Sequence, residues 1–138
     1  MSELFDKKMK FARLLPRLLD HIFESGYAAT IGDVQRSWAG KDAFESAAAS
    51  VSAGDQGLFD RLRRKIFYGS EVSLHLLGLA VDINLFKFSD GTWTYLTQTE
   101  DHIPFGAYWK SLDADCQWGG EGTRNDGNHY SIGYKGRW

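Results

Sequence analysis

The feature that most constrains this chain is an apolar run, residues 79–86, with a carboxylate in its middle. Four aliphatic residues alternate strictly with four residues of other kinds, which is the period of a β-strand: Leu79, Val81, Ile83 and Leu85 against Ala80, Asp82, Asn84 and Phe86. Asp82 therefore points away from the aliphatic layer. A carboxylate between apolar neighbours is costly to dehydrate unless a cation or several donors meet it. We therefore expect Asp82 to have a partner.

The rest of the chain divides into helical signals in the first half and paired strands in the second. Apolar residues at helical spacing over 14–23 predict a helix that stops near Gly26. An Asp90-Gly91 turn signal predicts a hairpin after the first strand, and Pro104 suits the start of another helix. We also predict a short strand and turn at 27–37, helices at 42–51 and 58–68, and a last strand at 129–134. The predicted fold class is α+β, with helices packed on a small antiparallel sheet.

Composition bounds the chain to one ordinary globular core. It has 138 residues, of which 43% are hydrophobic and 25% charged, so we expect a single domain over 1–138 and a monomer. The net charge of −2 gives no electrostatic reason for nucleic-acid binding, and the basic run at 61–65 fits the solvated face of a helix. Cys116 is the single cysteine, which excludes an internal disulfide and a multi-cysteine zinc cluster.

Targeting signals are not evident in the sequence. Arg13, Pro16 and Asp20 interrupt any signal-peptide core near the N-terminus, and no segment approaches membrane-spanning length. We therefore expect a chain that is made in the cytoplasm and has no stable membrane association.

The partner of Asp82 comes from a glycine-rich loop before the last predicted strand. Asp126 and His129 lie three apart there and could reach a site beside Asp82 and His75. Catalytic zinc commonly takes three protein ligands and keeps a fourth position for water, whereas structural zinc is usually closed by four ligands, mostly thiolates. With one cysteine available, three histidine or carboxylate ligands are the more economical interpretation. Alone, His75 would more often be a structural histidine, and only the joint occurrence of these residues favours a metal site.

Two motifs in order carry a family resemblance. Residues 73–82 follow the pattern Ser-x-His-x-x-Gly-x-Ala-x-Asp, and "WGG" at 118–120 is followed by Asp126-x-x-His129. Over about 27–134, the chain resembles the zinc peptidases that cut peptidoglycan stem peptides, both the D-alanyl-D-alanine carboxypeptidases and the phage L-alanyl-D-glutamate endopeptidases. The family usually has Phe after the last histidine, where this chain has Tyr130, and the segment 37–70 is longer than the family leads us to expect.

The resemblance implies a role for each matching residue. It makes the zinc ligands His75, Asp82 and His129, and the catalytic acid/base Asp126; it implies substrate contacts at Arg36 and Ser73, and we expect Trp118 to line the cleft. Two alternatives stay open from the residues themselves. Glu121 could be the base in place of Asp126, and His102 could touch the metal instead of serving a structural role.

The likeness to compact lysis enzymes leads us to expect a zinc metallopeptidase hydrolysing the L-Ala–D-Glu bond of the stem peptide. Such a phage or prophage endolysin would leave the host cytoplasm only when released to the cell wall. The alternatives are a D-alanyl-D-alanine carboxypeptidase or dipeptidase, and an inactive zinc-bearing cell-wall-binding module.

Overall fold

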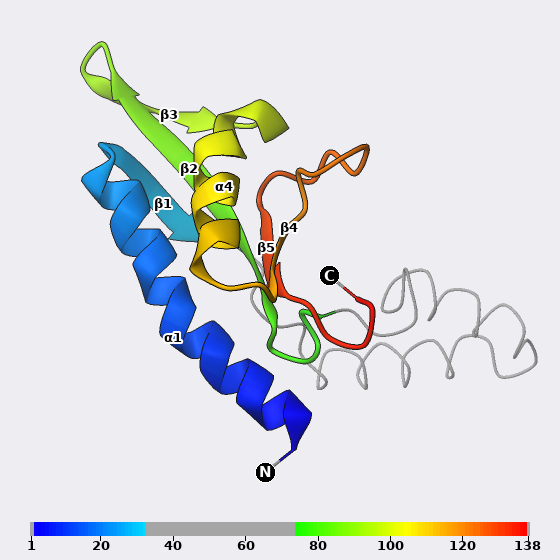
Figure 1. Ribbon diagram of the computed structural model, residues 1–138. Coiled ribbons are helices and arrows are strands. Elements are labelled where there is room, and N and C mark those ends of the chain that lie inside the picture. Colours follow the sequence, from blue (N-terminus) through cyan, green and yellow to red (C-terminus); the bar gives the residue numbers. More distant parts are fainter. Residues whose placement is uncertain (1, 33–73, 138) are drawn as a thin grey trace, which may run out of the picture.

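The computed structural model describes residues 2–32 and 74–137 of the chain. In order, these residues form helix α1 (Glu3–Glu24), strands β1 (Tyr27–Ile31), β2 (Ala80–Ser89) and β3 (Thr92–Leu96), the 3-10 helix η1 (Thr99–His102), helix α4 (Ile103–Leu112), and strands β4 (Cys116–Trp118) and β5 (His129–Ile132). Figure 1 shows β2 running through the middle of the sheet, with α1 and α4 beside it.

Helix α1 forms because its two ends are capped and one face is apolar. The Ser2 hydroxyl accepts a hydrogen bond from the backbone N–H of Phe5, which satisfies one of the free donors of the first turn. Leu18 and Ile22 are fully buried on the inner face. After the helix, Gly26 has a φ of +85°, a left-handed conformation that glycine adopts at little cost, and the chain turns there into β1.

The sheet is antiparallel and is organised around β2. Strand β1 pairs with one edge of β2 over Ile83 to Lys87. The other edge is shared by two strands placed end to end: β5 pairs with Ala80 to Asp82, and β3 pairs with Leu85 to Ser89. Strand β4 completes the sheet outside β5, in the order β1-β2-β5-β4. The short stretch of β2 between β5 and β3 is thus left without a strand on that edge.

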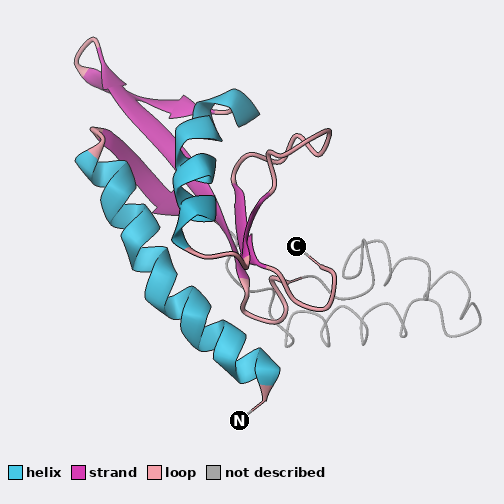
Figure 2. Cartoon of the chain, viewed as in Figure 1, coloured by secondary structure: helices cyan, strands magenta, loops and turns pink. Residues whose placement is uncertain are grey.

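Both helices pack on the same face of this sheet, and Figure 2 shows them together in front of the strands. The core between the two layers contains the alternating aliphatic residues of β2, together with Phe105 and Trp109 of α4. Cys116 lies in this core, where burial raises the pKa of its thiol to about 12, so it is a packing residue. The opposite face of β2 carries Asp82 and Asn84, as the alternation predicts.

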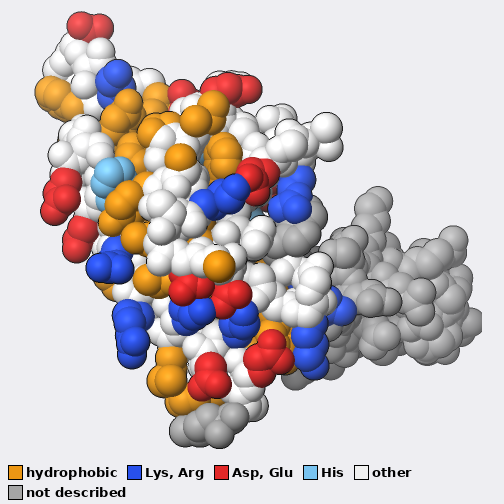
Figure 3. Space-filling model, in the orientation of Figure 1, with side chains coloured by type: hydrophobic (Ala, Val, Ile, Leu, Met, Phe, Trp, Pro, Cys, Tyr) orange, Lys and Arg blue, Asp and Glu red, His pale blue; other side chains and the backbone are white. Residues whose placement is uncertain are grey.

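Salt bridges fasten α1 to the connection between α4 and β4. The Lys10 ammonium lies 3.0 Å from Asp113 and 2.6 Å from Asp115, and Lys7 lies 2.8 Å from Asp115. Figure 3 shows acidic and basic side chains side by side on this part of the surface. In the part of the chain that the structure describes, no helix combines the length and apolar character needed to cross a membrane.

Most predicted elements are confirmed, including the α+β class, the first helix, the central strand, the hairpin and the helix after Pro104. Strand β4 was not predicted, because its three residues are too few to show a period. The helices predicted at 42–51 and 58–68 lie outside the described residues, as do Arg36 and Ser73.

Candidate metal centre

Two of the three predicted ligands face each other across neighbouring strands. Asp82 lies in β2, His129 begins β5, and the two residues are direct partners in the antiparallel ladder. Directly opposite residues have Cβ atoms about 4.5–5.5 Å apart on one face of a sheet. Here Nδ1 of His129 lies 3.4 Å from Oδ1 of Asp82. The register of the sheet therefore fixes this half of the site.

His75 reaches the same point from the turn that precedes β2. The N–H groups of Gly78 and Leu79 donate to the carbonyls of His75 and Leu74, at 3.2 and 2.9 Å. Gly78 has a φ of +70°, so the glycine of the motif ends this turn and lets the strand begin. Nε2 of His75 then lies 3.2 Å from Nδ1 of His129 and 3.4 Å from Oδ1 of Asp82.

These three atoms fit the donor set and spacing of a zinc site. Zinc bonds to imidazole nitrogen and carboxylate oxygen at about 2.0–2.2 Å, and the corners of such a tetrahedron stand about 3.3–3.6 Å apart. The observed separations of 3.2, 3.4 and 3.4 Å are close to that spacing. Among the described residues, His75, Asp82 and His129 are the one group of three or more side chains that could hold a metal ion.

The local electrostatics keep Asp82 in the form that binds a metal. Burial on its own raises the pKa of this carboxyl, but hydrogen bonds and positive charge from His129 and His75 outweigh it and lower the pKa to about 2. Asp82 is therefore ionised across the physiological range. His75 is 6% exposed and the side chain of Asp82 is 26% exposed, so the histidine is shielded from water and the carboxylate is only partly shielded.

The loop that carries Asp126 is fixed to the strand that carries His129. The N–H of Asp126 donates to the Gly119 carbonyl at 3.1 Å, and the N–H groups of Gly119 and His129 donate to the carbonyls of His129 and Asp126, at 2.9 and 3.1 Å. A Cβ atom at Gly119 would lie 2.4 Å from the Asp126 carbonyl oxygen, so glycine is required for this close approach. The side chain of Asp126 itself is exposed.

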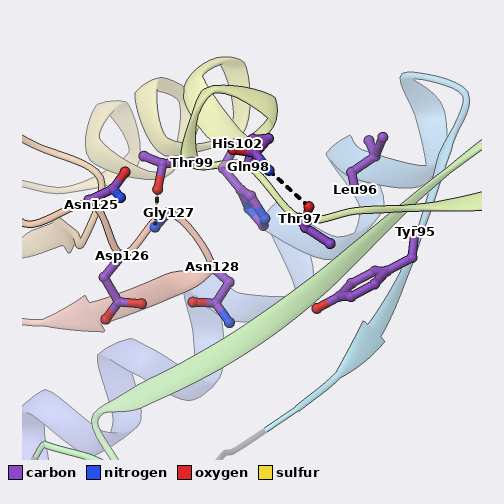
Figure 4. Close-up of a pocket in the computed structure, with 10 residues that line it drawn as sticks. All are labelled: Tyr95, Leu96, Thr97, Gln98, Thr99, His102, Asn125, Asp126, Gly127 and Asn128. Atoms are coloured by element: carbon purple, nitrogen blue, oxygen red, sulfur yellow. Dashed lines mark hydrogen bonds between the residues drawn. The ribbon is translucent and has the colours of Figure 1, made fainter.

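Asp126 also lines a cavity of about 130 Å³ at the gap between β5 and β3. Its lining is mostly polar and includes Tyr95, Thr99 and Asn128. In Figure 4 the side chains of Asp126, Asn128 and Tyr95 lie in a row along one side of the sheet. Sequence reasoning missed Asn128 and Tyr95. The alternation over residues 79–86 could have indicated this region, because it places Asn84 on the same face as Asp82. Asn84 accepts a hydrogen bond from Tyr95.

Trp118, predicted as a cleft residue, is placed in the interior. Its side chain is 7% exposed, and a Cβ added at Gly106 or Gly120 would overlap its indole ring. Its Nε1 donates to the Gly127 carbonyl at 2.7 Å. Trp118 therefore supports the loop that carries Asp126, and its role as a substrate contact stays a prediction.

The two alternatives to the predicted roles have partners elsewhere. Glu121 forms an ion pair with Lys110 of α4. His102 is 3% exposed, and its Nδ1 lies 2.8 Å from the Tyr130 hydroxyl, so the tyrosine that replaces the family's usual Phe has a buried polar partner. Burial lowers the pKa of His102 to about 4, which keeps this imidazole neutral. Neither residue belongs to the His-Asp-His cluster.

One comparison with known proteins covers the part of the chain that carries this site. A family model described as D-alanyl-D-alanine carboxypeptidase matches residues 68–132, a span that includes all three candidate ligands and Asp126. A search of curated proteins found no significant match. Among solved structures, a crystal structure of a mutant of VanY, the vancomycin-resistance D,D-pentapeptidase from a VanB-type cassette, in complex with Zn(II), is similar: 19% identity over 89% of this chain and 70% of that chain, with a TM-score of 0.49.

The fold and the His-Asp-His cluster define a zinc-dependent peptidase. Residues 68–132, a little less than half of the chain, match the model of the D-alanyl-D-alanine carboxypeptidase family. The resemblance inferred from the two motifs is thereby confirmed, over a shorter span than the predicted 27–134. Arg36 lies outside the matched span, and its role stays a prediction.

Proposed function

We propose that this chain is a zinc D,D-carboxypeptidase that removes the terminal D-Ala from peptidoglycan stem peptides. The observation that carries the proposal is the triangle of His75, Asp82 and His129, because it lies inside the span matched by the carboxypeptidase family. The family description favours the D-Ala–D-Ala bond over the L-Ala–D-Glu bond that the sequence alone led us to expect.

In this proposal the metal and Asp126 divide the chemistry. His75, Asp82 and His129 would hold the zinc ion, and the bound ion would supply Lewis-acid chemistry to a water molecule and to the scissile carbonyl. Asp126 accepts the proton of the attacking water and passes it to the leaving amine, a role worth about 10²–10⁴-fold in rate. Backbone hydrogen bonds between Gly119, Asp126 and His129 fix the short loop that carries Asp126 next to the ligand His129.

Substrate binding draws on the polar surface beside the metal. The cavity lined by Asn128 and Thr99 offers amide and hydroxyl groups for the backbone of a stem peptide. We assign Arg36 and Ser73 to the substrate as well, with the guanidinium of Arg36 pairing with a carboxylate. Action on the L-Ala–D-Glu bond, as a lysis enzyme released from the cytoplasm to the wall, is the second reading and an outcome of the test.

The test is product analysis with two substrates. Zinc-loaded protein is incubated with a sugar-free stem pentapeptide and with purified peptidoglycan, and the products are identified by mass spectrometry. Release of free D-Ala supports the proposal. New D-Glu amino termini with no free D-Ala would overturn it in favour of the endopeptidase, and no cleavage of either substrate would point to the binding module.

A further inference from the structure

The face of the sheet that holds Asp82 also carries a strip of aromatic side chains. Side chains of β2 alternate, so Phe86 and Phe88 lie on the face of Asp82, opposite the layer of helices. Their direct partners across the hairpin are Tyr95 and Trp93. We call these four residues, Phe86, Phe88, Trp93 and Tyr95, the aromatic strip.

Three of the four rings in the aromatic strip are exposed, and Phe86 is half-buried. Phe88, Trp93 and Tyr95 are 54%, 53% and 51% exposed. The rings meet in two cross-strand pairs, Phe86 with Tyr95 at 5.3 Å and Phe88 with Trp93 at 5.2 Å between centroids. None of the four belongs to the buried core. Such an exposed apolar patch is typical of a binding surface.

The strip is continuous with the catalytic side of the molecule. The Tyr95 hydroxyl donates to Oδ1 of Asn84 at 3.3 Å, and Nδ2 of Asn84 donates to the Thr30 hydroxyl at 3.3 Å. Tyr95 also lines the cavity that contains Asp126. Figure 4 shows Tyr95 and Asp126 at opposite ends of that cavity. One surface therefore runs from the metal centre to the hairpin.

Distance along β2 indicates which part of a substrate reaches the strip. Phe86 and Phe88 follow Asp82 by four and six residues, or about 13–20 Å at roughly 3.3 Å per residue of strand. In a stem pentapeptide, four residues separate the D-Ala–D-Ala bond from the sugar. When extended, these residues span roughly 13 Å. A stem peptide with its terminal bond at the metal would place its sugar over the strip.

We propose that the aromatic strip binds the glycan strand of peptidoglycan while the stem peptide lies along β2. This inference rests on the proposed function for its register. Pyranose rings are uncharged and present C–H faces that pack on the electron-rich faces of aromatic rings. Phe88 and Trp93 supply such faces, and the charged residue between Phe86 and Phe88, Lys87, is on the other side of the sheet, over the Tyr27 ring. The strip thus suits a neutral sugar better than a charged peptide.

The test compares substrates with and without sugar, using the full zinc-loaded chain. Trp93→Ala should lower kcat/KM for D-Ala release from a disaccharide-pentapeptide about five- to tenfold, the range expected for one aromatic contact. Release from the sugar-free pentapeptide should change less than about twofold. Trp93→Tyr should restore most of the loss, because a tyrosine ring keeps a stacking face. Equal losses on both substrates, or no loss on either, would overturn the proposal.

Phe23→Ala is the matched control, because Phe23 is also 54% exposed but lies on α1. It should leave both substrates unaffected. A second arm does not depend on which bond is cut: Asp126→Asn protein is co-sedimented with purified peptidoglycan, with N-acetylglucosamine oligosaccharides as competitor. Competition that Trp93→Ala weakens supports the strip even if no D-Ala is released, in which case only the proposed bond fails. Two results would overturn the proposal. In the first, Trp93→Ala retains sedimentation with peptidoglycan but changes the oligomeric state; in the second, the strip binds lipid vesicles.

Discussion

The two ends of β2 follow the same alternation of side chains, but the outward face of the strand differs between them: one end carries the metal ligands and the other carries exposed aromatic rings. At the Ala80 end, β5 pairs with β2 and β4 lies outside β5. On the polar face there, Asp82 meets His75 and His129 at one point. At the Ser89 end, β2 has only the hairpin strand β3 beyond Lys87, and the same face presents exposed aromatic rings. The period of a strand determines which side chains share a face. What that face does depends on the neighbours that the rest of the chain brings to it.

The largest effect is expected at the Ala80 end of β2, where the metal ligands lie. Asp82→Asn should lower zinc affinity at least about 100-fold and reduce peptidase activity to background, because it removes the charged member of the ligand triangle. Zinc content after dialysis, and competition with a chromophoric chelator, measure the effect. Asn84→Ala, two residues along the same face, should keep the metal. Wild-type zinc affinity in Asp82→Asn would refute the ligand assignment.

Next in size is the separation of metal binding from proton transfer. Asp126→Asn should retain zinc and the fold but lose about 10²–10⁴-fold in kcat, because Asp126 moves protons without binding the metal. Glu121→Gln should change kcat less than about threefold, since Glu121 is paired with Lys110. Steady-state kinetics on the cleaved substrate decide between them. The reverse order of effects would assign the base to Glu121.

Near the metal ligands, the stability of the fold should depend on Gly119, because a side chain there would clash with the backbone. Gly119→Ala would bring a Cβ within 2.4 Å of a backbone oxygen and 2.9 Å of the His129 Cβ, so the loop must shift. We expect a loss of about 3 kcal/mol in the free energy of unfolding, with weaker zinc binding. Chemical denaturation measures the change in the free energy of unfolding. Gly133→Ala, whose nearest neighbours are 3.5 Å away, is the control and should cost far less.

Sequence alone predicts the metal end better than the surface around it. The alternation over 79–86 and the spacing of Asp126 and His129 suffice to propose the ligands, because strand register brings Asp82 and His129 together once the two strands pair. The cavity was not predictable, since it arises where β3 ends and β5 begins on one edge of β2. Nor was the burial of Trp118, which depends on Gly106 in a distant helix. Contacts between segments far apart in the chain leave no periodic pattern in the local sequence, so they cannot be predicted from it.

His102, buried at the end of η1 beside Tyr130 of β5, should make the stability of the fold depend on pH. Its pKa is about 4 when buried and about 6.5 when exposed on unfolding, so below pH 6.5 the unfolded chain takes up a proton that the folded chain does not. The free energy of unfolding is therefore greatest above pH 6.5 and falls as the pH drops towards 4, with a loss of about 2–3 kcal/mol at pH 4.5. His102→Gln should remove this part of the slope.

The measurement is urea denaturation at several pH values with a chelator present, so that metal loss does not contribute. His75 and His129 are common to both proteins, and the difference between the two curves isolates His102. Parallel curves for wild type and His102→Gln would show that His102 does not carry the predicted pH dependence.

The smallest effect should come from the hairpin turn, and it tests whether the two ends of β2 are independent. Asp90 and Gly91 have φ values of 52° and 77°, the pattern of a type I′ turn, and a Cβ at Gly91 would meet nothing within 4 Å. Gly91→Ala therefore adds backbone strain without a clash, worth about 1 kcal/mol. Amide hydrogen exchange should accelerate in β3 and in the second half of β2, while zinc affinity stays at the wild-type value. Asp90→Asn should be nearly neutral, because asparagine tolerates the left-handed region. A drop in zinc affinity in Gly91→Ala would mean that the strand transmits strain from the hairpin to the metal, and the two ends would have to be treated as one unit.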